Sequence, residues 1–405
     1  MPESLAPERR NPLEVLLAFL RLGCTSFGGP IAHLGYFRDE FVTRRRWVDE
    51  SSFADLVALC QFLPGPASSQ VAFALGVARG GSLRGGVAAW VGFTLPSAAL
   101  LMLCALGAGA LSGPAAEGLL HGLKLVAVAV IAQAVLGMAQ NLTPDRPRAG
   151  IALAAVLIVT FAAGPIAQIA AIAAGAAAGL VLCRAEAPSV AGRLGFSVPR
   201  WRGAAALALF ALLFLAAPIL ARTTGQQSAA LFDAFYRSGA LVFGGGHVVL
   251  PLLEAETVGR GWVGEPDFLA GYGLAQAVPG PLFTVAAYLG AVMGPAPNGI
   301  AGAAIALVAI FLPGMLLVYG MLPFWDEFRR LPTAQAAMRG ANAAVVGILA
   351  AALYAPVAVN ALQSPRDFAL ALTGFLLLTA WRVPPWMIVL GLGAFGVALR
   401  LTALG

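Results

Sequence analysis

The stretch Gln61-Phe62-Leu63-Pro64-Gly65-Pro66 returns later in the chain as Gln276-Ala277-Val278-Pro279-Gly280-Pro281. Each copy lies in an apolar segment, where proline removes a backbone donor and glycine permits an unusual turn. The apolar pieces on either side of residues 64–66 are too short to cross a bilayer alone, since a spanning helix needs about 20 residues. The pattern therefore predicts a re-entrant hairpin or a discontinuous helix in each half of the chain.

The composition places these segments in a membrane. Of the 405 residues, 60% are hydrophobic and 11% are charged, and the mean hydropathy is +0.85. A soluble domain averages about 25% charged residues. Nearly uncharged stretches occupy residues 86–111, 121–140, 149–183, 203–221, 300–322, 336–360, 367–381 and 384–399. We therefore expect an all-α integral membrane protein in the lipid bilayer, and the polar first residues, without an A-x-A site, indicate no cleavable signal peptide.

The duplication extends beyond the Pro-Gly-Pro stretches. Several unrelated residue types hold the same order in both halves: Arg21 with Arg237, Phe27-Gly28-Gly29-Pro30 with Phe243-Gly244-Gly245-Gly246, Trp47 with Trp262, Phe53 with Phe268, and Leu95-Pro96 with Leu312-Pro313. Chance does not explain such an order, so we interpret the halves as homologous repeats. The predicted division is a first membrane repeat over residues 1–183, a linker with one extra spanning helix over residues 184–227, and a second repeat over residues 228–405.

Arginine placement predicts how the repeats are oriented. Arginines flank residues 52–79, the segment that Pro64 interrupts, and they gather again near residues 146–148 and 184–202. The positive-inside rule places these arginine-rich stretches in the cytoplasm. The extra span then inverts the second repeat. In that repeat the loop equivalent to the arginine-rich loop is acidic on balance, which agrees with an external position. Arg366 is an exception, because this topology places it outside. Inverted-topology repeats are a common transporter architecture with the substrate near the midplane. The sequence therefore favours transport over another role for a duplicated scaffold.

The Pro-Gly-Pro elements form the first candidate binding site. Pro66 and Pro281 would each begin a half-helix, whose free N–H groups and positive dipole end attract an anion. Hydroxyl and amide side chains lie beside both elements. The predicted substrate-binding residues here are Gln61, Pro64, Gly65, Pro66, Ser68, Ser69, Gln276, Pro279, Gly280, Pro281 and Thr284. The alternative is a pair of kinks that serve packing alone.

The glycine elements with their upstream arginines form the second candidate. Gly28-Gly29 and Gly244-Gly245 let the backbone approach closely or expose amide groups. Arg21 and Arg237 lie about two helical turns ahead, in apolar segments where arginine usually faces a partner or a water-filled path. A planar guanidinium suits a tetrahedral oxyanion. Snorkelling of both arginines to the interface is the equally weighted alternative.

Lys124 and three titratable residues complete the candidate site. Lys124 is the only lysine and begins a long apolar segment, where it either helps to bind an anion or anchors the helix at the interface. His33 and His247 follow the glycine elements, and Asp55 is the only acid in the first Pro-Gly-Pro segment. These side chains are candidates for proton coupling, although the two histidines also suit a structural role.

Other functional classes find no support in the sequence. It has no aspartate-rich metal motif, HExxH, GxSxG or P-loop, and its Gly-Gly elements do not follow a strand. Cys24, Cys60, Cys104 and Cys183 lie apart and are interpreted as free thiols. The net charge of +6 reflects cytoplasmic loops rather than nucleic-acid binding. We therefore expect no enzyme, no cofactor, no bound metal and no nucleic-acid partner.

The ordered motifs resemble those of the chromate ion transporter family. Phe27-Gly28-Gly29-Pro30 with Arg21 upstream, the stretch from Trp47 to Phe53, and residues 61–66 resemble its first domain, and the second copy resembles its long, two-domain form. The resemblance implies a secondary transporter that exports chromate across the bacterial inner membrane, commonly described as proton-driven. The family's signature residues carry over to Gly28, Gly29, Pro30, Pro64, Gly65, Pro66, Gly244, Gly245, Pro279, Gly280 and Pro281. Gly246 stands where the first copy has Pro30, so unequal contributions from the halves are expected.

The resemblance leaves the anion open. Sulfate is tetrahedral with the same charge as chromate, so a transporter of sulfate or of another oxyanion is one alternative. A non-transporting membrane protein on the duplicated scaffold is the other. The sequence also leaves open the transport direction, the coupling ion and whether the chain forms a homodimer.

Overall fold

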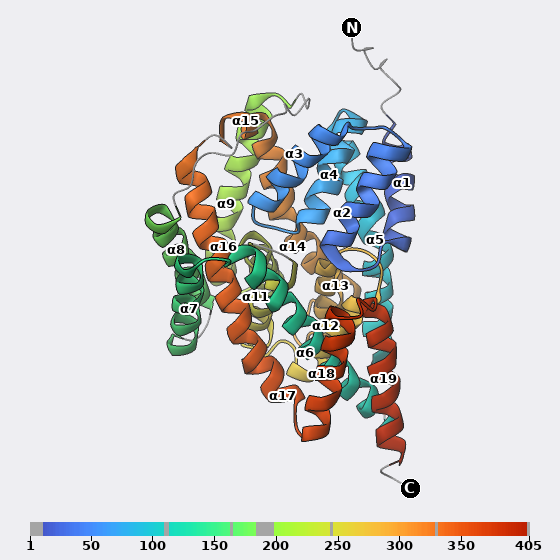
Figure 1. Cartoon of the computed structure of the whole chain (residues 1–405). Helices are drawn as coiled ribbons and strands as arrows, with labels where there is room; N and C mark the ends of the chain where they lie inside the picture. Colours follow the sequence, from blue (N-terminus) through green and yellow to red (C-terminus); the bar gives the residue numbers. More distant parts are fainter. Residues whose placement is uncertain are drawn as a thin grey trace.

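The computed structural model describes residues 11–108, 113–162, 165–183, 198–243, 246–328 and 331–402. Within these ranges helices are the only regular elements (Figure 1). Five helical segments are long and apolar enough to cross a bilayer: those of α5 (Leu83–Ala108), α6 (Pro114–Leu142), α9 (Arg200–Thr224), α14 (Gly299–Met321) and α16 (Pro332–Ala352). The prediction of an all-α integral membrane protein is confirmed.

The first repeat is broken at the two positions that the sequence indicates. The Ser26–Gly28 segment separates α1 (Pro12–Thr25) from α2 (Gly29–Phe37), and residues 63–66 separate α3 (Glu50–Phe62) from α4 (Ala67–Gly80). A π-helical turn, Arg38–Arg44, follows α2. Each fragment is shorter than a spanning helix, as expected for broken segments.

The second repeat shows the same breaks. Its fragments are α10 (Gln227–Ala240), α11 (Val249–Thr257), α12 (Glu265–Ala277) and α13 (Val285–Val292). One expectation differs, because Pro281 leads into a tight 3-10 turn, Leu282–Thr284, rather than directly into the half-helix. The amide and hydroxyl of Thr284 both donate to the Pro281 carbonyl, at 3.0 and 2.7 Å, and these two bonds to a residue three positions back hold the tighter turn.

The rear helices of each repeat pack on the other repeat. α7 (Arg146–Phe161) and α8 (Pro165–Leu182) lie against α16, while α18 (Pro365–Thr379) and α19 (Pro385–Thr402) lie against α6 (Figure 1). Glycines allow the close approach on both sides. A Cβ atom on Gly179 would lie 2.3 Å from the Ala336 carbonyl oxygen, and one on Gly122 would lie 2.3 Å from that of Leu392. Small residues at such crossings are typical of helix packing in membranes.

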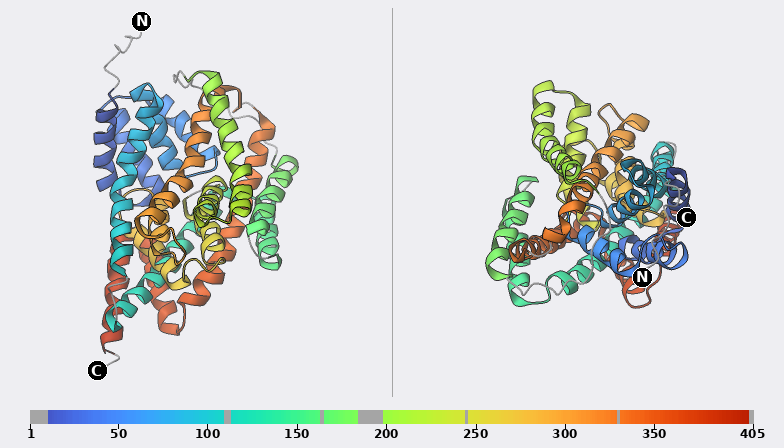
Figure 2. Two further views of the ribbon diagram at one scale, coloured as in Figure 1. Left: turned by 180° about the vertical axis from the view of Figure 1, so that it is seen from behind. Right: turned by 90° about the horizontal axis from the view of Figure 1, so that it is seen from above.

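Figure 1 shows α1 to α4 of the first repeat in the upper half of the molecule, α11 and α13 of the second repeat near its middle, and α12, with the rear helices α17 (Val359–Ala361) and α18, in the lower half. The remaining short helix, α15 (Trp325–Phe328), lies at the upper end, where α9 begins. α9 lies at the edge of the bundle when the molecule is seen from above (Figure 2). Only 6% of the most apolar 18-residue stretch of this helix is buried. The described part of the chain therefore leaves most of the apolar surface of α9 uncovered.

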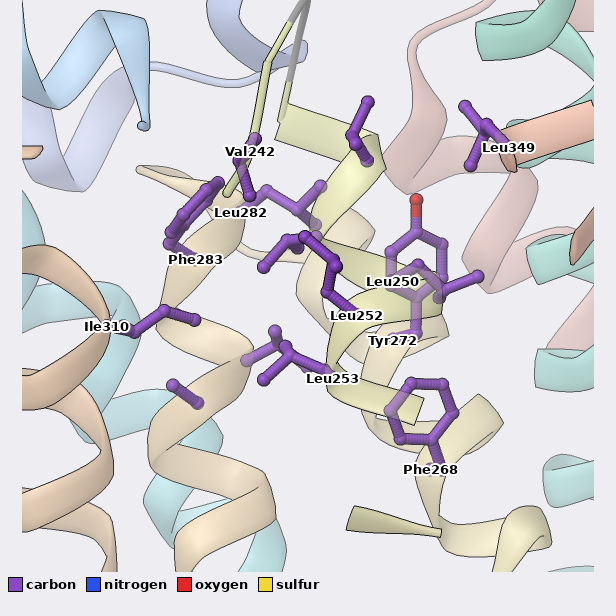
Figure 3. Close-up of a cluster of buried hydrophobic side chains, with 14 of the residues drawn as sticks. Val242, Leu250, Leu252, Leu253, Phe268, Tyr272, Leu282, Phe283, Ile310 and Leu349 are labelled. Carbon is purple, nitrogen blue, oxygen red and sulfur yellow. The ribbon is translucent and has the colours of Figure 1, made fainter. Parts of the chain in front are cut away.

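A large hydrophobic cluster, built from the second repeat together with first-repeat residues such as Leu125 and Ile151, lies next to the Pro-Gly-Pro loop of the second repeat. Val242, Leu282 and Phe283 lie close together in this cluster, with Tyr272 among its other members (Figure 3). A separate cluster, which includes Phe19, Phe37 and Phe93, forms the core around α1 to α5. The broken helices are thus held on both sides by packed apolar side chains.

Candidate functional site

Each Pro-Gly-Pro loop docks on the opposite repeat. The Gly65 amide donates to the Val242 carbonyl oxygen at 2.7 Å, and the Gly280 amide donates to the Ser26 carbonyl oxygen at 2.9 Å. Ser26 and Val242 are equivalent positions, directly before the Phe-Gly-Gly elements. The four breaks therefore meet at one junction between the repeats, which a comparison of the two halves in sequence could not show.

The backbone at this junction requires glycine. Gly65 has φ +123° and Gly280 has φ +103°, a range that side-chain-bearing residues rarely adopt. A Cβ atom on Gly65 would lie 3.0 Å from the Cα atom of Gly314, and one on Gly280 would lie 2.8 Å from Ser97 Oγ. Gly314 and Ser97 directly follow the prolines inside α14 and α5. Each loop thus rests on the proline-containing helix of the opposite repeat.

Buried polar atoms without a partner gather in the first repeat around this junction. Ser68 and Ser69, at the start of α4, are buried, and His33 Nδ1 lies 3.4 Å from Ser68 Oγ. Among the described residues, no partner bonds Ser26 Oγ, His33 Nε2, Ser69 Oγ or Thr94 Oγ1. A buried polar group left unpaired costs about 1–3 kcal/mol. Such a group of atoms therefore suits water or a polar ligand.

The glutamines near the loops have different roles from one another. Gln61 is exposed on α3, whereas the Nε2 atom of Gln276 is buried and has no partner within the described ranges. Gln70 uses its amide group structurally, because Nε2 donates to the carbonyl oxygens of Pro64 and Gly314, both at 3.0 Å. Its amide hydrogens hold the loop on α14 and are not available to an anion. Thr284 likewise donates to the Pro281 carbonyl, which leaves its oxygen as an acceptor.

The structure separates the three predicted cations. Arg21 is exposed on α1, and Lys124 is half-buried on α6. Arg237 is half-buried on α10 and forms an ion pair with Asp233. In the described part of the chain, neither Arg21 nor Lys124 forms an ion pair, and none of the three side chains bonds a Pro-Gly-Pro loop. Only Arg237 therefore meets the expectation of an intramembrane arginine that faces a partner.

The proton-coupling candidates lie in different surroundings. His33 faces Ser68 and packs edge-on against Phe93, whereas His247 Nδ1 lies 2.6 Å from the Tyr272 hydroxyl. Asp55 is half-buried on α3. These three side chains do not form one group.

The two glycine elements approach each other. A Cβ atom on Gly246 would lie 3.5 Å from Pro30 Cγ, so the positions that differ between the two elements are neighbours in space. Gly244 and Gly245, two of the predicted binding residues, lie outside the described residues.

A Glu–Arg–Trp unit recurs in both repeats, and sequence reasoning missed it as a functional feature. In the first, Arg45 Nε lies 2.6 Å from Glu40 Oε1 and its guanidinium lies over the Trp47 ring at 5.4 Å. In the second, Arg260 pairs with Glu256 and lies 5.0 Å from the centre of the Trp262 ring. The sequence does contain a signal for this unit: the two tryptophans are matched between the repeats, and each has an arginine two positions before it.

The donor atoms at the junction favour an anion over a metal ion. The described residues contain no group of three or more histidine, cysteine or acidic side chains that could hold a metal. The four cysteines are free, and two of them, Cys60 and Cys183, are buried. The donors at the junction are hydroxyls, ring nitrogens and the first amides of α4. Such donors suit an anion held by hydrogen bonds and a helix N-terminus.

Duplicated broken helices around a junction at the repeat interface define a polytopic membrane protein of the transporter class. The chromate transporter family model matches residues 13–180 and again residues 229–397. The chain belongs to this family, in the long form with two copies of the domain.

Relatives over nearly the whole length have names that agree with this family. A chromate transport protein of Pseudomonas aeruginosa is 30% identical over 396 residues, covering 94% of this chain and 90% of that protein. A chromate transport protein of Cupriavidus metallidurans is 27% identical, covering 95% and 92%. A probable chromate transport protein of Synechococcus elongatus is 29% identical, covering 90% and 88%. No solved structure matches the chain.

Proposed function

We propose that this chain is a secondary transporter that exports chromate across the bacterial inner membrane, coupled to the proton gradient. The names of its relatives support the substrate, and the reciprocal docking of the two Pro-Gly-Pro loops supports the site. This docking carries the proposal, because it brings the broken helices of both repeats to one place. A junction between two repeats is where alternating access would expose a bound anion to either side.

The anion would bind at the start of α4. The first amides of this helix and the hydroxyls of Ser68 and Ser69 are donors in a buried setting, and the helix dipole favours negative charge there. Ser26, His33 and Gln276 supply further unpaired polar atoms. The cations Arg237 and Lys124 would contribute positive charge from a distance rather than by contact.

Opposite orientation of the two repeats is part of this proposal. It is supported by the placement of α1 to α4 in the upper half of the molecule and of α12 in the lower half (Figure 1), and by the arginine-rich loops of the first repeat. The division into residues 1–183, 184–227 and 228–405 belongs to the same proposal. Accessibility of a single cysteine placed in one loop of each repeat tests the orientation directly.

Sulfate is the alternative substrate. Hydrogen-bond donors and a helix N-terminus recognise charge and tetrahedral shape, and these two properties are shared by both anions. Discrimination between them therefore requires a direct competition experiment.

The test is uptake of labelled chromate and of labelled sulfate, each with and without the other, in everted membrane vesicles that carry the protein. Chromate accumulation that depends on an imposed proton gradient supports the proposal. Accumulation of sulfate alone moves the assignment to sulfate. Movement of neither, by protein that is correctly inserted, supports a non-transporting membrane protein.

A matched pair of variants locates the site. Ser69→Ala removes a buried hydroxyl of the junction, whereas Thr223→Ala removes an exposed hydroxyl that bonds only the backbone of α9. We expect the first to reduce chromate uptake and the second to leave it unchanged. Equal uptake by both variants would remove Ser69 from the site.

A further inference from the structure

Four charged side chains of the second repeat form a group, of which the proposed anion site uses only Arg237, and that only as a distant positive charge. Arg237 pairs with Asp233 on α10, and Arg260, which follows α11, pairs with Glu256 on that helix. The carboxylate side chains are 6% and 4% exposed, and the arginines are 22% and 34% exposed. The Glu256 carboxylate also lies in the field of Arg237 and Asp233, so the two pairs act on each other electrostatically.

A small cavity lies beside the two pairs. Its volume is about 10 Å³, and its lining includes Arg237, Glu256, Ser238 and Gln168. Such a cavity has room for roughly one water molecule. Gln168 comes from α8 of the other repeat; its Nε2 donates to the Pro251 carbonyl at 3.1 Å, and its buried Oε1 has no partner among the described residues. The cavity therefore offers a water both a carboxylate and an unpaired acceptor.

The Asp233–Arg237 pair lies well inside α10, whereas Glu256 is next to the last residue of α11 and Arg260 follows that helix. Arg237 stands ten residues after Gln227, the first residue of α10. At 1.5 Å per residue this is about 15 Å, roughly half the thickness of the hydrocarbon core. Buried carboxylates and arginines at such depth are expensive, and they commonly mark ion or proton pathways.

The first repeat differs at the equivalent positions. Leu17 occupies the position equivalent to Asp233 and is 56% exposed, and Arg21 is exposed one turn later. Glu40 keeps the position of Glu256, but it pairs with Arg44 and Arg45 near the arginine-rich loop. Within the described ranges, only the second repeat thus joins a buried carboxylate to an arginine deep in its own broken helix.

We propose that Glu256 takes up and releases the proton that is coupled to transport, with Arg237 and Asp233 setting the charge around it. This inference rests on the proposed transport function. A proton passes from water in the cavity to a Glu256 oxygen, so that one O–H bond breaks in the donor and one forms on the carboxyl group. The net charge of the four side chains rises from zero to +1, which changes the attraction of an anion to this side of the junction.

The other charged groups around Glu256 do not meet the same conditions for carrying the coupled proton. Asp233 and Glu256 are each paired with an arginine, but only Glu256 lines the cavity. On α11 itself Glu254 is half-buried, lies in the field of Glu265 and does not line the cavity.

Apart from Asp233 of α10, the described helices packed against α11 add no acidic side chain. The neighbouring helix α8 has no charged residue between Pro165 and Leu182. Arg339 of α16 donates to the Cys183 carbonyl, and His247 before α11 is bonded to Tyr272. Glu256 is therefore the carboxylate that both lines the cavity and lies beside Arg237.

The experiment uses the purified full-length protein in proteoliposomes. Exchange of labelled for unlabelled chromate is measured at equal pH on both sides, and net accumulation is measured under a gradient of one pH unit. One coupled proton supports up to about tenfold accumulation in that gradient. We expect Glu256→Gln to exchange chromate without accumulating it, while Glu40→Gln, the matched change in the first repeat, accumulates chromate like the unaltered protein.

Accumulation by Glu256→Gln equal to that of the unaltered protein would overturn the inference. If Glu256→Gln does not insert, Glu256→Asp keeps a carboxylate and provides the test: a shifted pH profile of accumulation supports the inference, and an unchanged profile contradicts it. Failure of the transport proposal is seen separately, as absence of chromate exchange by the unaltered protein.

Discussion

The two repeats share their backbone and differ in their chemistry. Both are broken at the same places, and both dock a Pro-Gly-Pro loop on the opposite glycine element through one amide bond. The first repeat has unpaired neutral polar atoms of Ser26, His33 and Ser69 at the junction, whereas the second has the Asp233–Arg237 ion pair where the first has Leu17 and Arg21. The comparison indicates that the two repeats share the backbone geometry of the break while the side chains around it differ.

Packing gives the reason for this division. A backbone contact between repeats tolerates no added atom, so Gly65 and Gly280 are both fixed. Side chains that point into the junction from only one repeat are under no such constraint. Gly246 in place of Pro30 is an example of that freedom.

The largest expected difference between the repeats is the loss of stability on replacing Arg237 compared with that on replacing Arg21. Arg237→Ala leaves buried Asp233 without its partner, and loss of one member of a buried pair costs about 3–5 kcal/mol. Arg21→Ala removes an exposed side chain and should change stability by no more than about 0.5 kcal/mol. Thermal unfolding of the detergent-solubilised variants measures both. Equal effects would mean that the two arginines have equivalent surroundings, against the structure.

The effects of replacing the two loop glycines, Gly65 and Gly280, should differ less from each other. Alanine at either position is strained by its positive φ, at about 1–3 kcal/mol. Gly65→Ala adds a contact with the backbone of Gly314, whereas Gly280→Ala meets the Ser97 hydroxyl, which is able to rotate. We therefore expect the greater loss of stability and of chromate uptake for Gly65→Ala, measured by thermal unfolding and by vesicle uptake.

A second change sharpens this comparison. Ser97→Gly removes the hydroxyl that the new methyl group of Gly280→Ala would meet, so the double variant should recover part of the lost uptake. The absence of any recovery would show that backbone strain alone accounts for the loss. Ser97→Gly by itself is the control for the effect of a new glycine in α5.

A still smaller difference in stability is expected at the N-terminal caps of α3 and α12. Asp49 caps α3 by accepting the Ser52 amide at 2.9 Å, whereas the equivalent Gly264 caps α12 without a side-chain bond. Asp49→Ala should therefore cost about 1 kcal/mol, and Gly264→Ser should gain a few tenths, roughly 0.3 kcal/mol. Chemical unfolding of the two variants measures these changes.

The effect of Asp49 should also depend on pH. Hydrogen bonds from the Ser52 amide and from the hydroxyls of Ser51 and Ser52 lower the pKa of Asp49 to about 2. Its pKa in the unfolded chain is about 3.9, so the stabilisation is complete above that value and is lost as pH falls toward 2. The difference in stability between Asp49→Ala and the unaltered protein should shrink below pH ~4. A difference that is constant with pH would contradict an ionised cap.

Much of the fold could be predicted from local sequence. The long apolar stretches became helices close to their predicted bounds, and the helices break where Gly28 and Pro64 indicate a break. Local rules failed where contacts decide the role. Gln70 follows Ser68 and Ser69 at the start of α4, but its amide group donates to the carbonyl oxygens of Pro64 and Gly314. Arg21 and Arg237 have equivalent positions and different surroundings, and here the local sequence holds part of the reason, because Asp233 precedes Arg237 by one turn where Leu17 precedes Arg21.

Local sequence was enough to establish a helical, membrane-embedded and duplicated chain that breaks near its glycines and prolines, because hydrophobicity, proline and glycine act on their own segment. Three features depended on the folded arrangement: each loop docks on the opposite repeat, α7 and α8 pack on α16 while α18 and α19 pack on α6, and Glu256 lies beside Arg237. These are contacts between segments that are separated in the chain. They depend on the shapes of both partners together, and no single stretch of sequence contains that information.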